Sequence, residues 1–229
     1  MTEWTRHAGG AGWYVLDDGR IKLEPDTHLG GIAAYVCTDA DGCIRTKGAP
    51  LTMQTLREEH GATIAAVASA FDLPEHWIAG MVSIEARKIK GSYSFDVVSL
   101  RHEPGYFSPE ETPNKVSAGL MQTLLSTAKR MAREYFDGVA GTGEFLLPQS
   151  EDLTVEDLTD PEVSLALGAA YMHFQSEIYG LDPVLLVASY NAGGVYETSK
   201  NPWRLRTFGY PRIPKFCGFA NDYLETVQI

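Results

Sequence analysis

Apolar residues recur at helical spacing along most of the chain after residue 50. Together with Pro, Asp and Ser start signals, this spacing predicts helices over residues 52–71, 74–85, 117–135, 161–180, 183–190 and 216–227. Before residue 50 the apolar stretches are short and β-prone, and turns separate them, which predicts one or two β-hairpins. We therefore expect a mainly α chain, with a loop-rich segment over residues 1–50 and a helical domain over residues 51–229.

Residues 91–116 follow neither pattern, because Gly and Pro interrupt them repeatedly. Four aromatic residues are interleaved there: Tyr93, Phe95, Tyr106 and Phe107. A long irregular stretch inside a compact domain is often functional. These side chains either line a sugar site, since ring faces pack on the apolar faces of pyranoses, or hold the loop against the core.

The composition is that of a globular protein, with 229 residues of which 44% are hydrophobic and 21% are charged. The formal net charge of −11 and the pI near 5.0 argue against a nucleic-acid binder, which usually carries a basic face. No stretch reaches the roughly 18 consecutive apolar residues of a membrane span. The first residues lack the apolar region of a signal peptide, so we expect synthesis in the cytoplasm and delivery by another route.

The three cysteines do not indicate a metal site, because they show neither CxxC nor His spacing. Cys37 and Cys43 flank a turn, so they are either bridged across a hairpin or free, and Cys217 has no obvious partner. The turn over residues 39–42 resembles the start of a calcium loop, but no Glu follows at the required spacing. We expect a plain turn and no metal.

Glu85 ends an apolar helix and is the first candidate for chemistry. Trp77, Met81 and Glu85 are spaced i, i+4, i+8, so they fall on one stripe of the helix. A carboxyl on an apolar stripe is poorly solvated, and we expect its pKa to rise, as a general acid requires. The alternatives are that Glu85 caps the helix, pairs with Arg87 or Lys88, or points to solvent.

Two further segments follow Glu85: Ser-Ala-Gly-Leu-Met-Gln over residues 117–122, and Ala-Ser-Tyr-Asn-Ala-Gly over residues 188–193. A glutamate at a helix end followed by these two segments resembles the lytic transglycosylases of the soluble (SLT) type, which are relatives of goose-type lysozyme. The resemblance covers about residues 60–229. It implies a mainly α, lysozyme-like α+β fold and the cleavage of peptidoglycan.

The resemblance also implies roles for the matching residues. Glu85 matches the catalytic acid, and Tyr190 matches the tyrosine that holds it by a hydrogen bond. The residues implied in binding the glycan, or in shaping its groove, are Tyr106, Ser117, Gly119, Met121, Gln122, Asn191 and Ala192. Glycine suits position 119, because it lets the backbone approach a ligand closely. The alternative for Tyr190 is a core aromatic whose hydroxyl bonds any partner.

The chain departs from the family pattern at two positions. Ala86 stands where the family usually has Ser directly after the glutamate, which removes one polar contact near the lactyl–peptide side of the substrate. Leu125 stands where a Pro often follows Leu-Met-Gln, and we expect little functional effect from it.

The implied reaction is cleavage of the β-1,4 bond between N-acetylmuramic acid and N-acetylglucosamine, with Glu85 as acid and then base and a 1,6-anhydro ring as product. No cofactor is needed. A hydrolytic, goose-type lysozyme would instead need a second carboxylate to activate water. The candidates for it are Asp96, Glu103, Glu110 and Glu111. The alternative of another class is an inactive glycan-binding or structural virion protein.

A wall-cleaving enzyme without a signal peptide suggests a bacteriophage product. It is then either an endolysin released through a holin or a virion-associated lysin that opens the wall during infection. Residues 1–50 either pack on the main domain or bind a partner, such as a virion or tail protein. The expected place of action is the cell wall in the periplasm.

Overall fold

The computed structural model describes residues 3–24, 36–47, 50–108, 111–138, 145–208 and 212–226. The helices in these residues are α1 (Leu51–Ala70), α2 (Glu75–Glu85), α3 (Leu125–Tyr135), α4 (Pro161–Tyr179), α5 (Pro183–Ala192) and α6 (Arg212–Glu225). The strands are β1 (Trp13–Val15), β2 (Ile21–Leu23), β3 (Val36–Thr38), β4 (Ile44–Thr46), β5 (Leu100–His102), β6 (Val116–Ala118) and β7 (Thr123–Leu124). The expected mainly α fold with short hairpins is confirmed.

The chain divides into two compact units. Unit 1 comprises Met1–Arg57, His76–Ile84 and Gln175–Ile229, and unit 2 comprises Glu58–Glu75 and Glu85–Phe174. These limits differ from the boundary expected after residue 50, and the division into a segment over residues 1–50 and a domain over residues 51–229 stays a prediction.

One helix prediction is wrong at its start. The helix expected over residues 117–135 begins only at Leu125, because Ser117 lies in β6 and a turn separates β6 from β7. Gly119 has a φ of 73° and Gln122 a φ of 47°, both in the left-handed region, which a right-handed helix does not include. The five other predicted helices are present, with ends that shift by a few residues.

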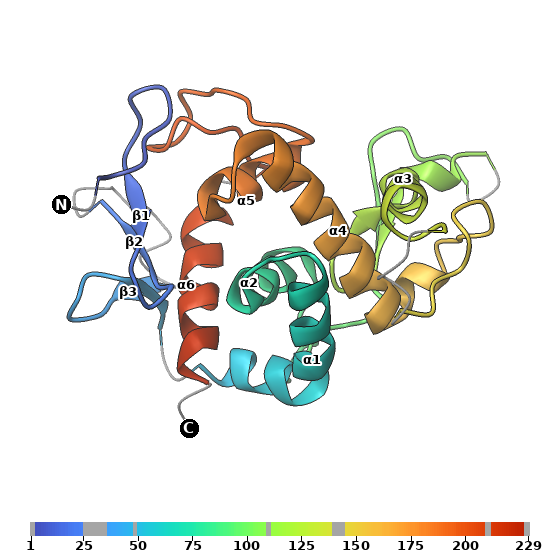
Figure 1. Ribbon diagram of the computed structural model, residues 1–229, viewed down its shortest axis with the longest axis horizontal. Helices are drawn as coiled ribbons and strands as arrows, with labels where there is room; N and C mark the ends of the chain where they lie inside the picture. Colours follow the sequence, from blue (N-terminus) through green and yellow to red (C-terminus); the bar gives the residue numbers. More distant parts are fainter. Residues whose placement is uncertain are drawn as a thin grey trace. The chain divides into compact units, whose positions relative to one another are not determined.

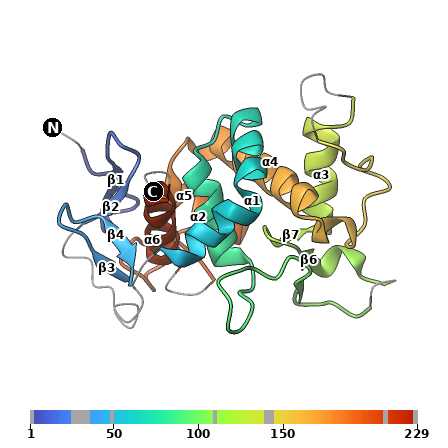
Figure 2. The ribbon, with the colours of Figure 1, turned by 90° about the horizontal axis from the view of Figure 1, so that it is seen from below.

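Unit 1 packs two antiparallel hairpins against α6, as Figures 1 and 2 show. Asn221 of α6 joins both hairpins, because its side-chain Oδ1 accepts from Ile21 N at 2.7 Å and its Nδ2 donates to Ile21 O at 2.9 Å and to Ile44 O at 2.7 Å. The hairpins expected before residue 50 are therefore present. Residues 31–35 of the predicted second strand lie outside the described residues.

Charged side chains strengthen the contact between β4 and α6. Arg45 Nε donates to Asp222 Oδ1 at 2.6 Å, and the same guanidinium pairs with Glu225. Of the two roles expected for the N-terminal segment, packing on the rest of the chain is observed for its described residues. Cys37, Cys43 and Cys217 are all free thiols.

Unit 2 contains a three-stranded antiparallel sheet in the order β5-β6-β7, followed directly by α3 (Figure 2). Phe71 anchors α1 in this unit, since its ring makes edge contacts with Tyr135 and Phe136 at centroid distances of 5.9 and 5.7 Å. His173 Nδ1 lies 2.9 Å from Phe71 O.

The stretch expected to be irregular, residues 91–116, contains the strand β5, which the sequence did not reveal.

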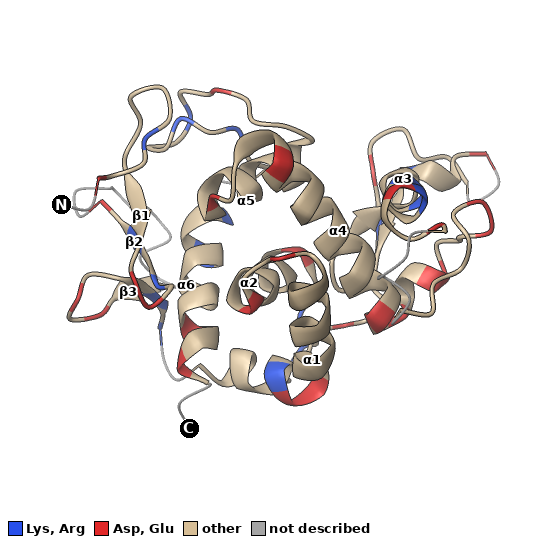
Figure 3. Cartoon of the chain, viewed as in Figure 1, with Lys and Arg blue, Asp and Glu red and all other residues tan. Residues whose placement is uncertain are grey.

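Acidic residues are frequent in the segment of unit 2 that precedes α4. Figure 3 shows acidic residues along residues 151–162, which lead into α4, and Lys and Arg on α3. No helix within the described part of the chain is long and apolar enough to cross a membrane.

Candidate active site

Glu85 is the last residue of α2 and is buried, with 5% of its surface exposed. Trp77 and Met81 on the same stripe are 4% and 0% exposed, so the predicted burial of this stripe is confirmed. The helix forms because an apolar run follows Pro74 and Glu75, and its only acidic residues are the two at its ends. The expected rise of the Glu85 pKa stays a prediction.

An arginine sixteen residues later contacts Glu85. Arg101 Nη1 lies 3.8 Å from Glu85 Oε2, and Arg101 Nη2 lies 3.5 Å from the backbone oxygen of Glu85. The two basic residues expected as partners are engaged elsewhere: Arg87 pairs with Asp96 at 2.5 Å, and Lys88 lies over the ring of Tyr93 at 4.9 Å. Glu85 thus takes part in an ion pair, but with a residue of β5.

The sheet places three polar side chains on one face. Arg101 of β5 stands directly opposite Ser117 of β6, so their side chains point to the same side. Ser117 Oγ donates to Glu103 Oε1 at 3.0 Å, which puts Glu103 on that side as well. Because Arg101 also reaches Glu85, this face carries two carboxylates, a guanidinium and a hydroxyl.

The turn between β6 and β7 is held by Gln122. Its side-chain Nε2 lies 3.0 Å from Ser99 O, 3.1 Å from Ser99 Oγ and 2.9 Å from Gly119 O. A Cβ at position 119 would lie 1.9 Å from Leu158 O, so glycine is required there by the protein's own backbone. The sequence had suggested glycine for access of a ligand, and the structure supplies this second reason.

Met121 is fully buried behind the same turn. Its backbone N donates to Ser164 Oγ at 3.1 Å, and a Cβ added to Gly168 of α4 would lie 2.4 Å from Met121 Cβ. Ser117 is 1% exposed. Of the residues implied in glycan binding, Ser117, Gly119 and Met121 therefore support the turn from the inside.

Tyr106 lies on another side of the sheet. Its ring stacks on that of His102, with centroids 3.8 Å apart and an interplanar angle of 9°. Side chains alternate along a strand, so His102 points away from the face of Arg101. The structure thus does not bring Tyr106 together with Arg101 and Ser117.

The remaining predicted residues lie on α5 in unit 1. Asp182 caps this helix by accepting from Val184 N at 3.0 Å and Leu185 N at 2.9 Å, as its Asp-Pro start predicted. Tyr190 is 9% exposed, and Asn191 Oδ1 accepts from Phe208 N at 2.5 Å. Ala192 is the last residue of the helix, which Gly193 ends in the left-handed conformation.

The candidates for a second carboxylate differ in their surroundings. Asp96 is paired with Arg87, Glu103 is hydrogen-bonded to Ser117, Glu111 is exposed, and Glu110 lies outside the described residues. Glu103 is therefore the candidate on the face that Arg101 shares. Among the residues that the structure describes, no group of three His, Cys, Asp or Glu is placed to hold a metal ion.

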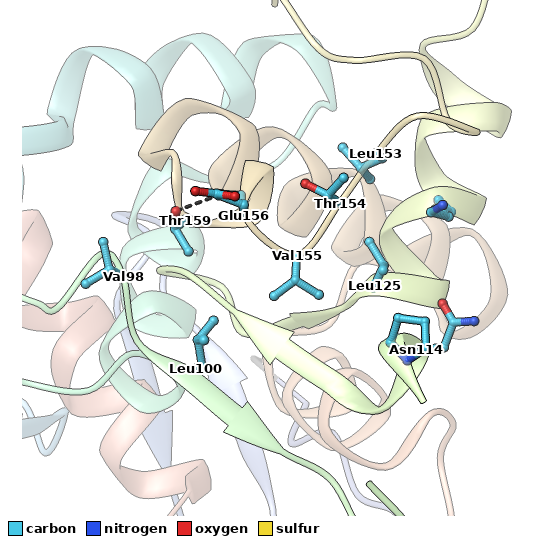
Figure 4. A pocket seen from close by; sticks show the side chains of 11 residues that line it. Val98, Leu100, Asn114, Leu125, Leu153, Thr154, Val155, Glu156 and Thr159 are labelled. Carbon is cyan, nitrogen blue, oxygen red and sulfur yellow. Dashed lines mark hydrogen bonds between the residues drawn. The ribbon is translucent and has the colours of Figure 1, made fainter. Parts of the chain in front are cut away.

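A separate pocket of about 790 Å³ lies in unit 2. Figure 4 shows the aliphatic side chains of Leu100, Leu125, Leu153 and Val155 around it, with Glu156 nearby. Leu100 precedes Arg101 on β5 and so points to the opposite face. None of the residues predicted for the site lines this pocket.

The sequence missed Arg101 as a partner of Glu85 and Ser99 as a partner of Gln122. Arg101 belongs to β5, which pairs with residues 116–118, and Ser99 directly precedes this strand. All three residues of β5 are exposed, so no alternation of buried and exposed positions marks the strand.

The comparisons with known proteins bear on this site. Curated proteins gave no match. A solved structure of an inactive variant of the lytic transglycosylase Slt from Pseudomonas aeruginosa is similar, with 22% identity, a TM-score of 0.41, and coverage of 73% of this chain and 22% of that chain. This chain therefore spans about a fifth of the length of that protein.

One protein family also matches, described as the transglycosylase SLT domain, over residues 96–201. Glu85 precedes the matched residues, whereas its ion-pair partner Arg101 lies among them, as do residues 117–122 and 188–193. Residues 96–201 of this chain are thus similar to the transglycosylase SLT domain, which agrees with the resemblance inferred from those two segments.

Proposed function

We propose that the chain is a lytic transglycosylase that cleaves the β-1,4 bond between N-acetylmuramic acid and N-acetylglucosamine in peptidoglycan. The observation that carries the proposal is the buried carboxyl of Glu85, placed by its contact with Arg101 against a sheet of the SLT-type segment. A carboxyl removed from water and held beside polar groups suits general acid–base work.

In the proposed reaction Glu85 acts twice. Protonated Glu85 first gives its proton to the glycosidic oxygen as the bond to C1 breaks. The resulting carboxylate then takes the proton of the muramic C6 hydroxyl, whose oxygen bonds to C1 and closes the 1,6-anhydro ring. Glu85 ends protonated, so the cycle needs no further acid, base or cofactor.

The other predicted residues take no part in proton transfer and instead hold Glu85 or shape the glycan groove. The resemblance assigns to Tyr190 the hydrogen bond that holds the carboxyl of Glu85, and to Asn191 and Ala192 a part in binding the glycan. Gln122 fixes the turn that forms another wall of the groove, with Ser117, Gly119 and Met121 packed behind it. Tyr106, stacked on His102, offers a ring face to a more distant sugar.

Hydrolysis is the second candidate, because Glu103 lies on the face that Arg101 and Ser117 share. A carboxylate there would act as the base that activates water, as in an inverting glycosidase, whose two carboxyls are roughly 6.5–9.5 Å apart. The two reactions differ in their products: anhydro ends from the transglycosylase and reducing ends from the hydrolase.

Mass spectrometry of muropeptides released from purified cell walls tests the proposal. We expect anhydro ends from the wild type and a loss of activity of at least about 100-fold in Glu85→Gln, which cannot donate a proton. The matched control is Glu75→Gln, the same change at the other end of α2, which should keep near wild-type activity. Reducing ends in place of anhydro ends would show that the chain is a hydrolase. Walls that stay intact would show that it cleaves no glycan and favour an inactive binding protein.

We further propose that the enzyme reaches the wall from a bacteriophage, either in the virion or through a holin. The described N-terminal residues pack on α6, which leaves their outer surface as the candidate contact with a virion protein. Detection of the chain in purified particles would support the virion role, and its absence would favour the endolysin.

A further inference from the structure

Arg101 contacts the proposed catalytic residue Glu85 and has been given no role in the reaction so far. The contacts given for it among the described residues are with the Glu85 carboxylate and the Glu85 backbone oxygen. Its side chain remains 46% exposed. The distance of 3.8 Å exceeds the roughly 2.7–2.9 Å of a charge-assisted hydrogen bond, so the pair is loose.

Burial and the guanidinium act on Glu85 in opposite directions. Removal of a carboxyl from water disfavours its ionised form, whereas a cation within about 4–6 Å favours it. The Glu85 side chain is 4% exposed, and Arg101 lies within this distance range. A group that first gives a proton and later takes one must reach both forms near the working pH, so these effects need to be balanced.

The other charged and titratable groups around Glu85 are less suited to this task. Arg87 follows α2 but is held by Asp96, and Lys88 lies over the Tyr93 ring. Glu103, on the face of β5 that carries Arg101, is an anion and would favour the protonated form of Glu85.

We propose that Arg101 is a positioning residue that offsets the burial of Glu85 and thereby sets the pH at which the enzyme ceases to work. The inference rests on the proposed function, in which protonated Glu85 starts the reaction. Because the pair is loose and the Arg101 side chain is half exposed, Arg101 stabilises the carboxylate without locking it, and Glu85 can still be protonated when glycan binds.

The test is the pH dependence of kcat/KM on soluble, uncross-linked glycan strands. Without the cation, Glu85 stays protonated to higher pH. The alkaline limb of the kcat/KM profile of Arg101→Gln should therefore lie about one pH unit above that of the wild type. Arg101→Lys keeps the positive charge, so its alkaline limb should shift less than that of Arg101→Gln. The matched control is Arg130→Gln, which removes an arginine that pairs with Glu134 at 3.6 Å on α3 and should not move the limb.

Coincident profiles of the wild type and Arg101→Gln would overturn the inference, as would an equal shift in Arg101→Lys. Should Arg101→Gln fail to fold, Arg101→Met, which also removes the charge, takes its place: the alkaline limb of its pH profile should move up, and an unmoved limb contradicts the inference. Failure of the proposed function is distinct, because the wild type would then release no muropeptides at any pH.

Discussion

Gly119 carries a backbone requirement that can be tested by a single substitution. Its φ of 73° is costly for alanine, and an added Cβ would lie 1.9 Å from Leu158 O and 2.6 Å from Ser164 Oγ. Since the first of these atoms belongs to the backbone, relief requires a shift of the chain. We expect Gly119→Ala to lower the free energy of unfolding by more than about 3 kcal/mol, measured by urea denaturation.

Gly91 provides the matched control for the steric part of that loss. Its φ of 80° is equally unusual, but a Cβ there meets nothing within 4 Å. Gly91→Ala should therefore cost only about 1–2 kcal/mol, the usual penalty of a left-handed residue. Equal losses in the two variants would show that contact with Leu158 does not matter.

At the scale of single residues, the sequence predicted the burial of Glu85 but not its ion-pair partner, Arg101. The stripe of Trp77, Met81 and Glu85 is local, so helical spacing alone reveals it. Arg101 reaches Glu85 only because β5 pairs with β6, and that pairing joins residues well separated in the chain. The same limit applies to Gln122, whose amide bonds Ser99 across the sheet.

At the scale of elements, one side chain of α6 is hydrogen-bonded to both N-terminal hairpins. Asn221 is 0% exposed and makes three hydrogen bonds to backbone atoms of Ile21 and Ile44. Replacement by alanine leaves a buried N–H and two carbonyls without this partner, each costing about 1–3 kcal/mol.

We therefore expect Asn221→Ala to reduce the free energy of unfolding by about 3–5 kcal/mol. Circular dichroism during urea titration measures it, and Asn114→Ala, at an exposed position, should change it by less than about 0.5 kcal/mol. A loss below about 1 kcal/mol in Asn221→Ala would mean that α6 holds the hairpins by apolar packing instead.

Elements with their own start signals were predictable, and elements that depend on pairing were not. α5 begins where Asp182 and Pro183 indicated, because its cap and first turn are local. β5 has three exposed residues and exists only through β6. The run over residues 117–122 looked helical by composition, yet the left-handed φ values of Gly119 and Gln122 make it a turn.

For the whole molecule, buried titratable groups determine how stability varies with pH. Burial lowers the pKa of His76 to about 4, while its Nε2 lies 3.1 Å from Gly19 O. Burial also lowers the pKa of His60. It raises the pKa of Asp182 and of Asp222 despite their hydrogen bonds. The histidines and the aspartates therefore contribute with opposite signs.

The folded state favours neutral His76, so its contribution is complete above the unfolded pKa of 6.5 and is lost as the pH falls toward about 4. The loss between pH 7 and pH 5 is about 2 kcal/mol by linkage. The buried aspartates work the other way, because acidification relieves the cost of their charge. We expect His76→Gln, which can still donate to Gly19 O, to lose about 2 kcal/mol less unfolding free energy than the wild type between pH 7 and pH 5. Urea titrations at the two pH values measure this loss. The control His102→Gln, at an exposed position, should lose as much as the wild type. If both variants lose as much stability as the wild type, His76 is charged in the folded protein, and its burial does not govern the acid limb.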